Sequence, residues 1–361
     1  MNTLQSHIQT ANYINIKKAY LEDIVLPVFN DIVRAVIPKE KYYRIAGKNI
    51  CIKFYSEALI KHLSFALLHN EINEIIPAKM IDLTINVWDS VSTSRQFPSP
   101  WSNTGYMFDQ KINTKNKLES GFMGVYLYGE ETLTLYDIKN KTAYFWTNDA
   151  DNLPYWVAAA PIRTLLHWFL SEINVHLLHG AAVAVGDKAI LIAAKGGSGK
   201  STMALSCLLL GMDYLADDYV GVELKDEIAV HSLYNSVKVV TSNISQFEAL
   251  QKHVWNKEGE KSILFLSLLF PKKIKKSRSL KAIFIPQIKY SKKTVISSAS
   301  KVQAMIALAP TTLFQLPLAE TDKIETIKKI IMGTPCYFLE MSSDSKEAAS
   351  VVSEFLEKLS C

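Results

Sequence analysis

The chain has 361 residues, about 48% of them apolar and 21% charged, which is typical of a soluble globular protein. A chain of this length is expected to form two domains or one large decorated domain. The composition argues against collagen, a disordered chain, a disulfide-rich mini-protein and an integral membrane protein. A formal net charge of +5 is too small to indicate a nucleic-acid-binding protein.

The positive charge is concentrated in residues 272–293, which contain nine basic residues and no acidic residue. The rest of the chain is therefore mildly acidic. We expect this segment to be a solvated loop that flanks a strand at 280–286. The alternative is that it attracts an acidic substrate, because a local excess of positive charge raises the rate of encounter with negatively charged partners.

The N-terminal residues contain no basic stretch followed by an apolar run, so we expect no secretory signal. The longest apolar stretches, such as residues 189–194, are far shorter than the roughly 20 residues that cross a bilayer. The cysteines form no CxxC pair, which fits neither a zinc site nor a disulfide framework and is typical of a reducing compartment. The sequence therefore predicts a cytoplasmic protein without a membrane partner. The four cysteines are Cys51, Cys207, Cys336 and Cys361.

The first part of the chain, residues 1–160, predicts an α+β domain. Its first 75 residues favour helices, and apolar side chains at helical spacing predict a core helix at 53–70. Residues 80–88 alternate between apolar and polar, and residues 125–146 predict three short strands joined by polar turns. We therefore expect an antiparallel meander in this domain.

From residue 161 to residue 361 strands and helices alternate, which is typical of an α/β domain. Its first half is expected to contain a helix at 161–172, strands at 175–185 and 188–194, a helix at 202–211, and strands at 213–218 and 219–224. Its second half is expected to contain a strand at 280–286, helices near 300–308 and 320–332, a strand at 336–340 and a closing helix at 345–359.

The strongest motif is residues 194–201, which read AKGGSGKS. This differs from the phosphate-binding pattern G-x-x-x-x-G-K-[ST] only at the first glycine, where the chain has Ala194. In such a loop the backbone N–H groups surround phosphate oxygens, and the following helix points its positive end at the same anion. A glycine-rich turn that binds nothing is the alternative. The loop follows an apolar strand and precedes a helix, which favours nucleotide binding.

Eight residues of this loop are expected to bind the nucleotide: Lys195, Gly196, Gly197, Ser198, Gly199, Lys200, Ser201 and Thr202. Lys200 would reach the β- and γ-phosphates, and Ser201 would offer its hydroxyl to Mg²⁺. The sequence thus predicts ATP and Mg²⁺ as cofactors.

Asp217 and Asp218 end the apolar strand that follows this loop and helix. At the carboxyl ends of strands in an α/β sheet, side chains gather around the ligand. One carboxylate could bind Mg²⁺ while the other accepts a proton from an attacking hydroxyl; an exposed Asp-Asp turn is the alternative. His179 is a third candidate, although a histidine in an apolar strand can also be a satisfied core residue, and we favour that interpretation for His176.

His179-Gly180, Lys200-Ser201 and Ala216-Asp217-Asp218 follow one another at separations that match a known family. His179 lies 21 residues before Lys200, and Asp218 lies 18 residues after it. In these residues the chain resembles the catalytic domain of bacterial HPr kinase/phosphorylase. The order of the later elements more closely resembles the stand-alone kinases encoded beside lasso and other ribosomal peptide genes. The resemblance implies an HPr kinase-like P-loop kinase domain that follows the N-terminal α+β domain.

The resemblance also implies roles. It makes Lys200 the phosphate-binding lysine, places His179 near the transferred phosphoryl group and assigns the base to Asp218. Asp217, with Ser201, would hold the metal. The catalytic residues would then be Asp218, Asp217, His179 and Lys200. The family's E-[IV]-R-G segment has no match. Residues 236–239 occupy that part of the chain, where Lys238 either supplies the missing positive charge or is a core-edge lysine, the interpretation that we favour.

The expected reaction is ATP- and Mg²⁺-dependent phosphorylation of a hydroxyl, with serine of a precursor peptide or small protein as the acceptor. The alternatives are a kinase for a small molecule such as an amino acid or sugar, and a nucleotide-gated regulatory ATPase without an acceptor. If the acceptor is a peptide, it could dock near Lys272–Lys293. A nucleic-acid partner is not expected, and the resemblance implies a homo-oligomer.

Overall fold

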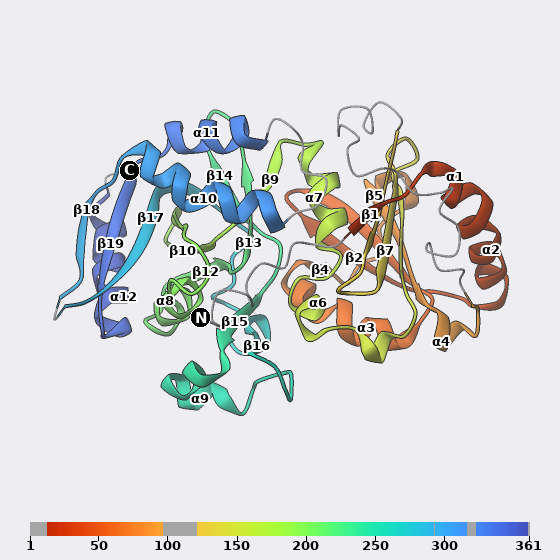
Figure 1. Cartoon of the computed structure of the whole chain (residues 1–361), viewed down its shortest axis with the longest axis horizontal. Helices are drawn as coiled ribbons and strands as arrows, with labels where there is room; N and C mark the ends of the chain where they lie inside the picture. Colours follow the sequence, from red (N-terminus) through yellow and green to blue (C-terminus); the bar gives the residue numbers. More distant parts are fainter. Residues whose placement is uncertain (1–12, 97–120, 292, 316–322, 360–361) are drawn as a thin grey trace, which may run out of the picture. The chain divides into compact units, whose positions relative to one another are not determined.

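The computed structural model describes residues 13–96, 121–291, 293–315 and 323–359 (Figure 1). Contacts within the chain divide it into two compact units. Unit 1 contains the described residues up to 169, apart from 66–69; unit 2 contains 66–69 and the described residues from 170 onward. Residues 66–69 belong to unit 2 because the backbone oxygen of Ala66 accepts hydrogen bonds from the backbone N–H of Asn235 at 2.8 Å and from its side chain at 2.9 Å. Each unit combines a sheet with helices, so the chain has a mixed α/β architecture.

Unit 1 contains an eight-stranded sheet in the order β1-β6-β7-β8-β5-β3-β2-β4. Strands β6, β7 and β8 pair antiparallel in chain order, whereas β5 runs parallel to both β3 and β8. The strands are β1 (Tyr13–Asn15), β2 (Lys39–Ile45), β3 (Lys48–Phe54), β4 (Glu71–Ile72), β5 (Leu83–Asp89), β6 (Phe122–Leu127), β7 (Thr132–Asp137) and β8 (Thr142–Thr147).

Aromatic side chains hold helix α2 to this sheet. The ring of Phe29 on α2 lies 5.1 Å from that of Tyr55, 5.2 Å from that of Trp88 and 5.2 Å from that of Tyr144, between centroids. The contacts with Tyr55 and Tyr144 are edge-to-face, and such contacts add to the gain from burying apolar area. The helices of unit 1 are α1 (Lys18–Tyr20), α2 (Leu26–Ala35), α3 (Glu57–Leu63), α4 (Ser90–Thr93), α6 (Tyr155–Ala159) and α7 (Arg163–Ser171), the last of which contains the boundary between the units.

Two expectations for unit 1 are wrong. The first 75 residues are not mainly helical, because β2 and β3 form an antiparallel hairpin. The helix predicted at 53–70 covers only α3 (Glu57–Leu63), followed by a 3-10 turn at Phe65–Asn70. Strand β3 pairs with β2 on one side and with β5 on the other. These pairings fix the start of the segment as a strand, and the periodicity of the segment itself does not reveal them.

Unit 2 contains a larger sheet, in which β12-β10-β11-β17-β14-β13-β9 are neighbours and β19 pairs with β17 and β18. The long strand β17 pairs with β14 through its first residues and with β19 through its later ones. The strands are β9 (Val175–His179), β10 (Ala181–Val185), β11 (Lys188–Ile192), β12 (Asp213–Ala216), β13 (Tyr219–Glu223), β14 (Ala229–Ser232), β17 (Ser277–Ser291), β18 (Val295–Ser298) and β19 (Cys336–Ser342). Strands β15 (Ser236–Val240) and β16 (Lys261–Phe265) form a separate pair.

Helices cover both faces of the unit 2 sheet (Figure 1). Helices α8 (Lys200–Leu209) and α12 (Ser345–Lys358) pack against one apolar cluster, and α10 (Lys301–Gln315) and α11 (Lys323–Gly333) against another. The short helix α9 spans Glu248–Gln251. Among the described residues, no helix has both the length and the apolar character needed to span a bilayer.

The expected single strand at 175–185 is interrupted at Gly180. Strand β9 pairs with β13, whereas β10 pairs with β11 and β12, so the two halves lie in different parts of the sheet. A Cβ atom on Gly180 would lie 2.9 Å from the backbone oxygen of Ile192. Glycine is therefore required where the chain crosses closely over β11.

The expected solvated loop at 272–293 is also wrong in its extent, because β17 (Ser277–Ser291) runs through the interior of the sheet. Several of its cations have partners within the chain. The ammonium of Lys281 lies 2.7 Å from Glu227, and the guanidinium of Arg278 lies 3.7 Å from Asp213. Part of the positive charge in this segment therefore compensates acids of the same unit.

We predict that Gly180→Ala lowers the free energy of unfolding by about 1–3 kcal/mol, because β10 and β11 must shift to admit the methyl group. Gly129→Ala is the control, since a Cβ there meets no atom within 4 Å. The control should change stability by less than about 0.5 kcal/mol. Denaturant unfolding of the full chain measures both effects, and equal losses would contradict the assigned close approach.

Candidate functional site

The glycine-rich loop connects β11 to α8, as its sequence predicts. Gly197 and Gly199 have φ values of +79° and +86°, in the left-handed region that glycine adopts without strain. Gly199 immediately precedes the first residue of α8. Lys195, Gly196 and Gly197 are exposed, so this part of the loop is open to a ligand.

Lys200, the first residue of α8, has its ammonium group inside this loop. The residue is only 7% exposed. Its Nζ atom donates to the backbone oxygens of Ala194 at 2.8 Å and Lys195 at 3.2 Å. Burial lowers the pKa of Lys200, and the nearby charges of Asp217 and Asp218 oppose that shift. The loop thus holds a buried positive charge at the positive end of a helix.

Two hydroxyl groups of the motif have contrasting environments. The Ser198 hydroxyl is buried without a hydrogen-bond partner, which is uncommon for a buried polar atom. The Ser201 hydroxyl donates to Oδ1 of Asp217 at 2.9 Å. The bond from Ser201 connects the start of α8 to Asp217, the residue that follows β12. Thr202, the third residue of α8, is half-buried.

Asp217 is 3% exposed and both of its carboxylate oxygens accept hydrogen bonds. Oδ1 accepts from Ser201, and Oδ2 accepts from the backbone N–H of Lys238 at 3.1 Å. Burial and the neighbouring charge of Asp218 raise the pKa of Asp217, although these hydrogen bonds oppose the shift. Burial of the charged Asp217 side chain therefore lowers the stability of the folded protein.

Asp218 has a φ of +72°, in the left-handed region that aspartate tolerates better than most residues. Its Oδ2 atom lies 2.5 Å from Nζ of Lys238, and its Oδ1 atom lies 3.4 Å from Nε2 of His179. Burial opposes its ionisation, but Lys238 and His179 outweigh this effect and hold the pKa of Asp218 well below its usual range. Asp218 is thus an ionised carboxylate between two basic side chains.

His179 ends β9, where it faces Tyr219 of β13 in the pairing of these strands. Its backbone N–H donates to the hydroxyl of Thr312 at 3.0 Å, and its Nδ1 atom is buried without a hydrogen-bond partner. Nε2 is therefore the ring nitrogen that faces Asp218. His176, three residues earlier, is half-buried, and its pKa falls to about 4 because of burial and the charges of Lys323 and Lys329.

The candidate site is thus a continuous chain of contacts within unit 2. Ser201 contacts Asp217, Asp217 contacts Lys238, and Lys238 contacts Asp218, which faces His179. Sequence reasoning favoured a core-edge lysine at Lys238, and the structure shows that this half-buried lysine pairs with Asp218. A lysine between valines in SVKVV is typical of a strand edge, and only the position of β15 beside the Asp-Asp turn reveals its partner.

The donors present fit Mg²⁺ better than a transition metal. The Ser201 and Asp217 oxygens lie 2.9 Å apart, and magnesium prefers such oxygen ligands, with water and phosphate completing the shell. The described residues contain no group of three or more His, Cys, Asp or Glu side chains arranged to hold a metal by themselves. A metal at this site would therefore depend on nucleotide oxygens.

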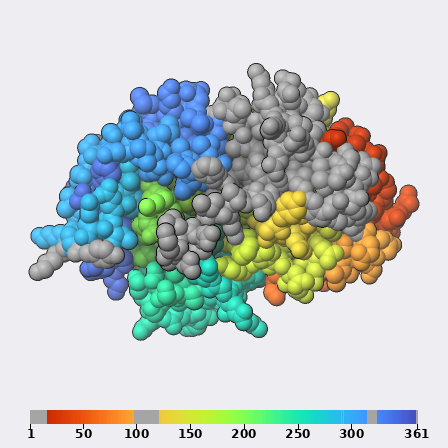
Figure 2. Space-filling model, in the orientation of Figure 1, coloured from red at the N-terminus to blue at the C-terminus, as the bar shows by residue number. Residues whose placement is uncertain are grey.

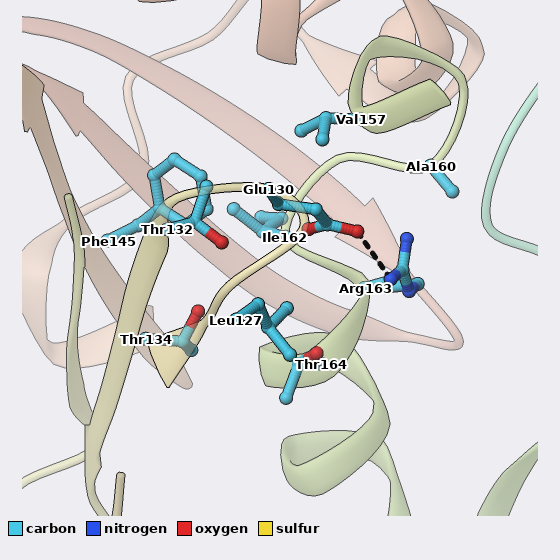
Figure 3. Close-up of a pocket in the computed structure, with 10 residues that line it drawn as sticks. All are labelled: Leu127, Glu130, Thr132, Thr134, Phe145, Val157, Ala160, Ile162, Arg163 and Thr164. Atoms are coloured by element: carbon cyan, nitrogen blue, oxygen red, sulfur yellow. Dashed lines mark hydrogen bonds and ion pairs between the residues drawn. The ribbon is translucent and has the colours of Figure 1, made fainter. Parts of the chain in front are cut away.

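A small cavity in unit 1 lies outside this site (Figure 3). Its volume of about 10 Å³ has room for one water molecule. The ion pair of Arg163 with Glu130, 2.5 Å apart, lines it, together with the hydroxyls of Thr132 and Thr164, which are buried without hydrogen-bond partners. The cavity is far too small for a nucleotide and contains none of the residues that the sequence singles out.

Comparison with known proteins gives limited information. No protein-family model and no curated protein matches the chain. Among solved structures, the HPr(Ser) kinase/phosphatase from Coxiella burnetii matches with a TM-score of 0.30 and 10% sequence identity, over 51% of this chain and 88% of that chain. Similarity at this level is too low to transfer an activity to this chain.

We predict that Asp217→Asn stabilises the protein by about 1 kcal/mol in metal-free buffer. The substitution removes the unfavourable buried charge, while the amide can still accept from Lys238 and donate to the Ser201 hydroxyl. Thermal unfolding of the full chain measures the effect.

Asp213→Asn, at the start of β12, is the matched control, because Asp213 is paired with Lys275 and Arg278 at 3.8 and 3.7 Å. The control should be neutral or destabilising. A loss of stability in Asp217→Asn as large as that in the control would contradict the assigned electrostatic cost.

Proposed function

We propose that this protein is an ATP- and Mg²⁺-dependent kinase that transfers the γ-phosphoryl group to a hydroxyl, with serine of a peptide or small protein as the acceptor. The observation that carries this proposal is the pairing of two adjacent carboxylates, one buried and one half-buried, with different partners. Asp217 is bonded to the Ser201 hydroxyl at the start of α8, whereas Asp218 faces Lys238 and His179. We assign the activity to residues 161–361, which contain all of these groups, and treat residues 1–160 as a separate N-terminal domain.

The loop would bind the nucleotide through its phosphates. Exposed loop amides, the N-terminus of α8 and the ammonium of Lys200 all present positive charge to the same point. The buried hydroxyl of Ser198, which has no hydrogen-bond partner, would donate to a phosphate oxygen once the side chain turns toward the ligand. Ser201 and Asp217 would hold Mg²⁺, which supplies charge neutralisation for the β- and γ-phosphates.

In the proposed reaction the acceptor oxygen attacks the γ-phosphorus. A new P–O bond forms, the bond from the γ-phosphorus to the bridging oxygen breaks, and its electron pair leaves with ADP. The hydroxyl proton passes to Asp218 and then to solvent. Because Asp218 is ionised, it can orient the acceptor through a hydrogen bond from the start, and positioning of this kind accounts for most catalysis of phosphoryl transfer.

The ends of β17 and β18 that adjoin in the sequence are the proposed docking surface for an acidic peptide. Lys289 and Lys293 are exposed there, and these strand ends reach the left edge of unit 2 in the view of Figure 2. Ile288, at the base of this end, lies beside the loop, because its Cδ1 atom is 3.9 Å from the position of a Cβ on Gly199. Within the region 272–293, we therefore propose Lys289 and Lys293 as the cations that bind the peptide.

We predict that Asp218→Asn slows transfer strongly while retaining ATP binding, since asparagine also tolerates a positive φ. Incubation with labelled ATP and a library of acidic serine peptides should yield a phosphopeptide with the wild-type chain. The variant should be about 10²–10⁴-fold slower, the range that general-base catalysis provides.

Asp187→Asn is the control, because the Asp187 side chain is 98% exposed. Turnover of Asp218→Asn at the wild-type rate would eliminate Asp218 as the base. ATP hydrolysis without any phosphoproduct would instead indicate a nucleotide-gated regulatory ATPase. Transfer to free amino acids or sugars, with peptides inert, would indicate a small-molecule kinase.

A second prediction concerns the acceptor. Reversing both charges in Lys289→Glu/Lys293→Glu should raise the KM for an acidic peptide about tenfold at low ionic strength, and less at high ionic strength, because salt screens exposed charges. The KM for ATP should not change.

The control is Lys272→Glu/Lys276→Glu, which makes the same charge change just before β17 begins. The length of β17 separates the two pairs by roughly 40 Å at 3.3 Å per residue. Equal effects of the two variants would show that the overall charge of the protein, and not the pair Lys289 and Lys293, attracts the peptide.

A further inference from the structure

Lys238 contacts both carboxylates of the candidate site. Its backbone N–H donates to Oδ2 of Asp217 at 3.1 Å, and its Nζ atom lies 2.5 Å from Oδ2 of Asp218. The Lys238 side chain is 14% exposed and the Asp218 side chain 18% exposed. Shielding from water at both ends makes this contact stronger than an ordinary surface ion pair.

The two oxygens of Asp218 are therefore not equivalent. Oδ2 is engaged by the ammonium of Lys238 at 2.5 Å, whereas Oδ1 is 3.4 Å from the His179 ring. The longer distance exceeds the roughly 2.7–2.9 Å of a charge-assisted hydrogen bond, so Oδ1 retains capacity for another donor. The backbone of Asp218 is fixed as well, since its oxygen accepts from the N–H of Gly180 at 3.3 Å.

We propose that Lys238 is a positioning residue that holds Oδ2 of Asp218 and thereby presents Oδ1 to the hydroxyl that attacks ATP. This inference rests on the proposed function. The lysine comes from β15, whose pairing with β16 sets Lys238 opposite Ile263. An element outside the main sheet thus orients the base, and removal of the ammonium would let the carboxylate turn toward His179.

The test measures hydrolysis of Mg²⁺-ATP by the full chain, so that water replaces the acceptor hydroxyl and no acceptor needs to be known. Lys238→Met keeps the side-chain length without its charge. It is expected to lower kcat about 10²-fold while the KM for ATP changes less than about threefold, because Asp218 acts on the attacking oxygen and not on the nucleotide. Lys238→Arg, which restores a positive charge, should have a kcat about tenfold higher than that of Lys238→Met.

Lys41→Met is the matched control. Lys41 lies 2.7 Å from Glu71, and the two side chains are 19% and 18% exposed, close to the values for Lys238 and Asp218. The control belongs to unit 1 and should leave kcat and KM unchanged. Thermal unfolding and ATP binding of each variant establish that it is folded.

The outcomes distinguish failure of the proposed kinase function from failure of the positioning role of Lys238. A wild-type chain that binds ATP but neither hydrolyses nor transfers its phosphoryl group would overturn the proposed function, and this inference with it. If the wild type turns over ATP, equal loss in Lys238→Met and Lys41→Met would overturn the positioning role alone. A raised KM for ATP with unchanged kcat would also overturn it, because Lys238 would then bind nucleotide. A kcat for Lys238→Arg no higher than that for Lys238→Met would also overturn the positioning role.

Discussion

Two adjacent carboxylates at the end of β12 are the constraint on which the candidate site depends. Buried negative charges are costly unless they are paired and hydrogen-bonded. Asp217 receives two hydrogen bonds, and Asp218 receives an ammonium group and a histidine ring. The partners come from β9, α8 and β15. The contacts of Asp217 and Asp218 therefore hold together three elements that are distant in the sequence.

This arrangement explains why the neighbouring backbone is so closely specified. Gly180 admits the close crossing at Ile192, and the oxygen of Asp218 accepts from the N–H of the same glycine. His179, directly before it, is held by the pairing of β9 with β13 and by the hydroxyl of Thr312. These contacts fix the backbone of His179, and its ring lies 3.4 Å from Asp218.

The sequence predicted the features whose signals are local. The glycine-rich loop, α8 and the antiparallel turn between β10 and β11 follow from residue type and spacing within a few positions. The sequence failed where distant pairing decides the structure. Residues 39–54 became strands because β5 lies beside β3, and the run at 175–185 was divided because its halves have different partners.

The candidate site shows the same division. His179, Lys200 and the two aspartates could be proposed from the spacing of three short motifs, but the contacts among them depend on strand order, which spacing does not reveal. Lys238 is the clearest case. Nothing within SVKVV distinguishes a lysine that meets an aspartate from one that meets water, and the difference lies in where β15 is placed.

The left-handed backbone of Asp218 also limits how this position can change during evolution. At a φ of +72°, asparagine and glycine can replace aspartate with little strain, whereas β-branched residues cannot. A lineage that abandons the chemistry but keeps the fold would then accumulate Asn or Gly at this position. Degenerate copies of this protein should be recognisable by that exchange even where the glycine-rich loop is preserved.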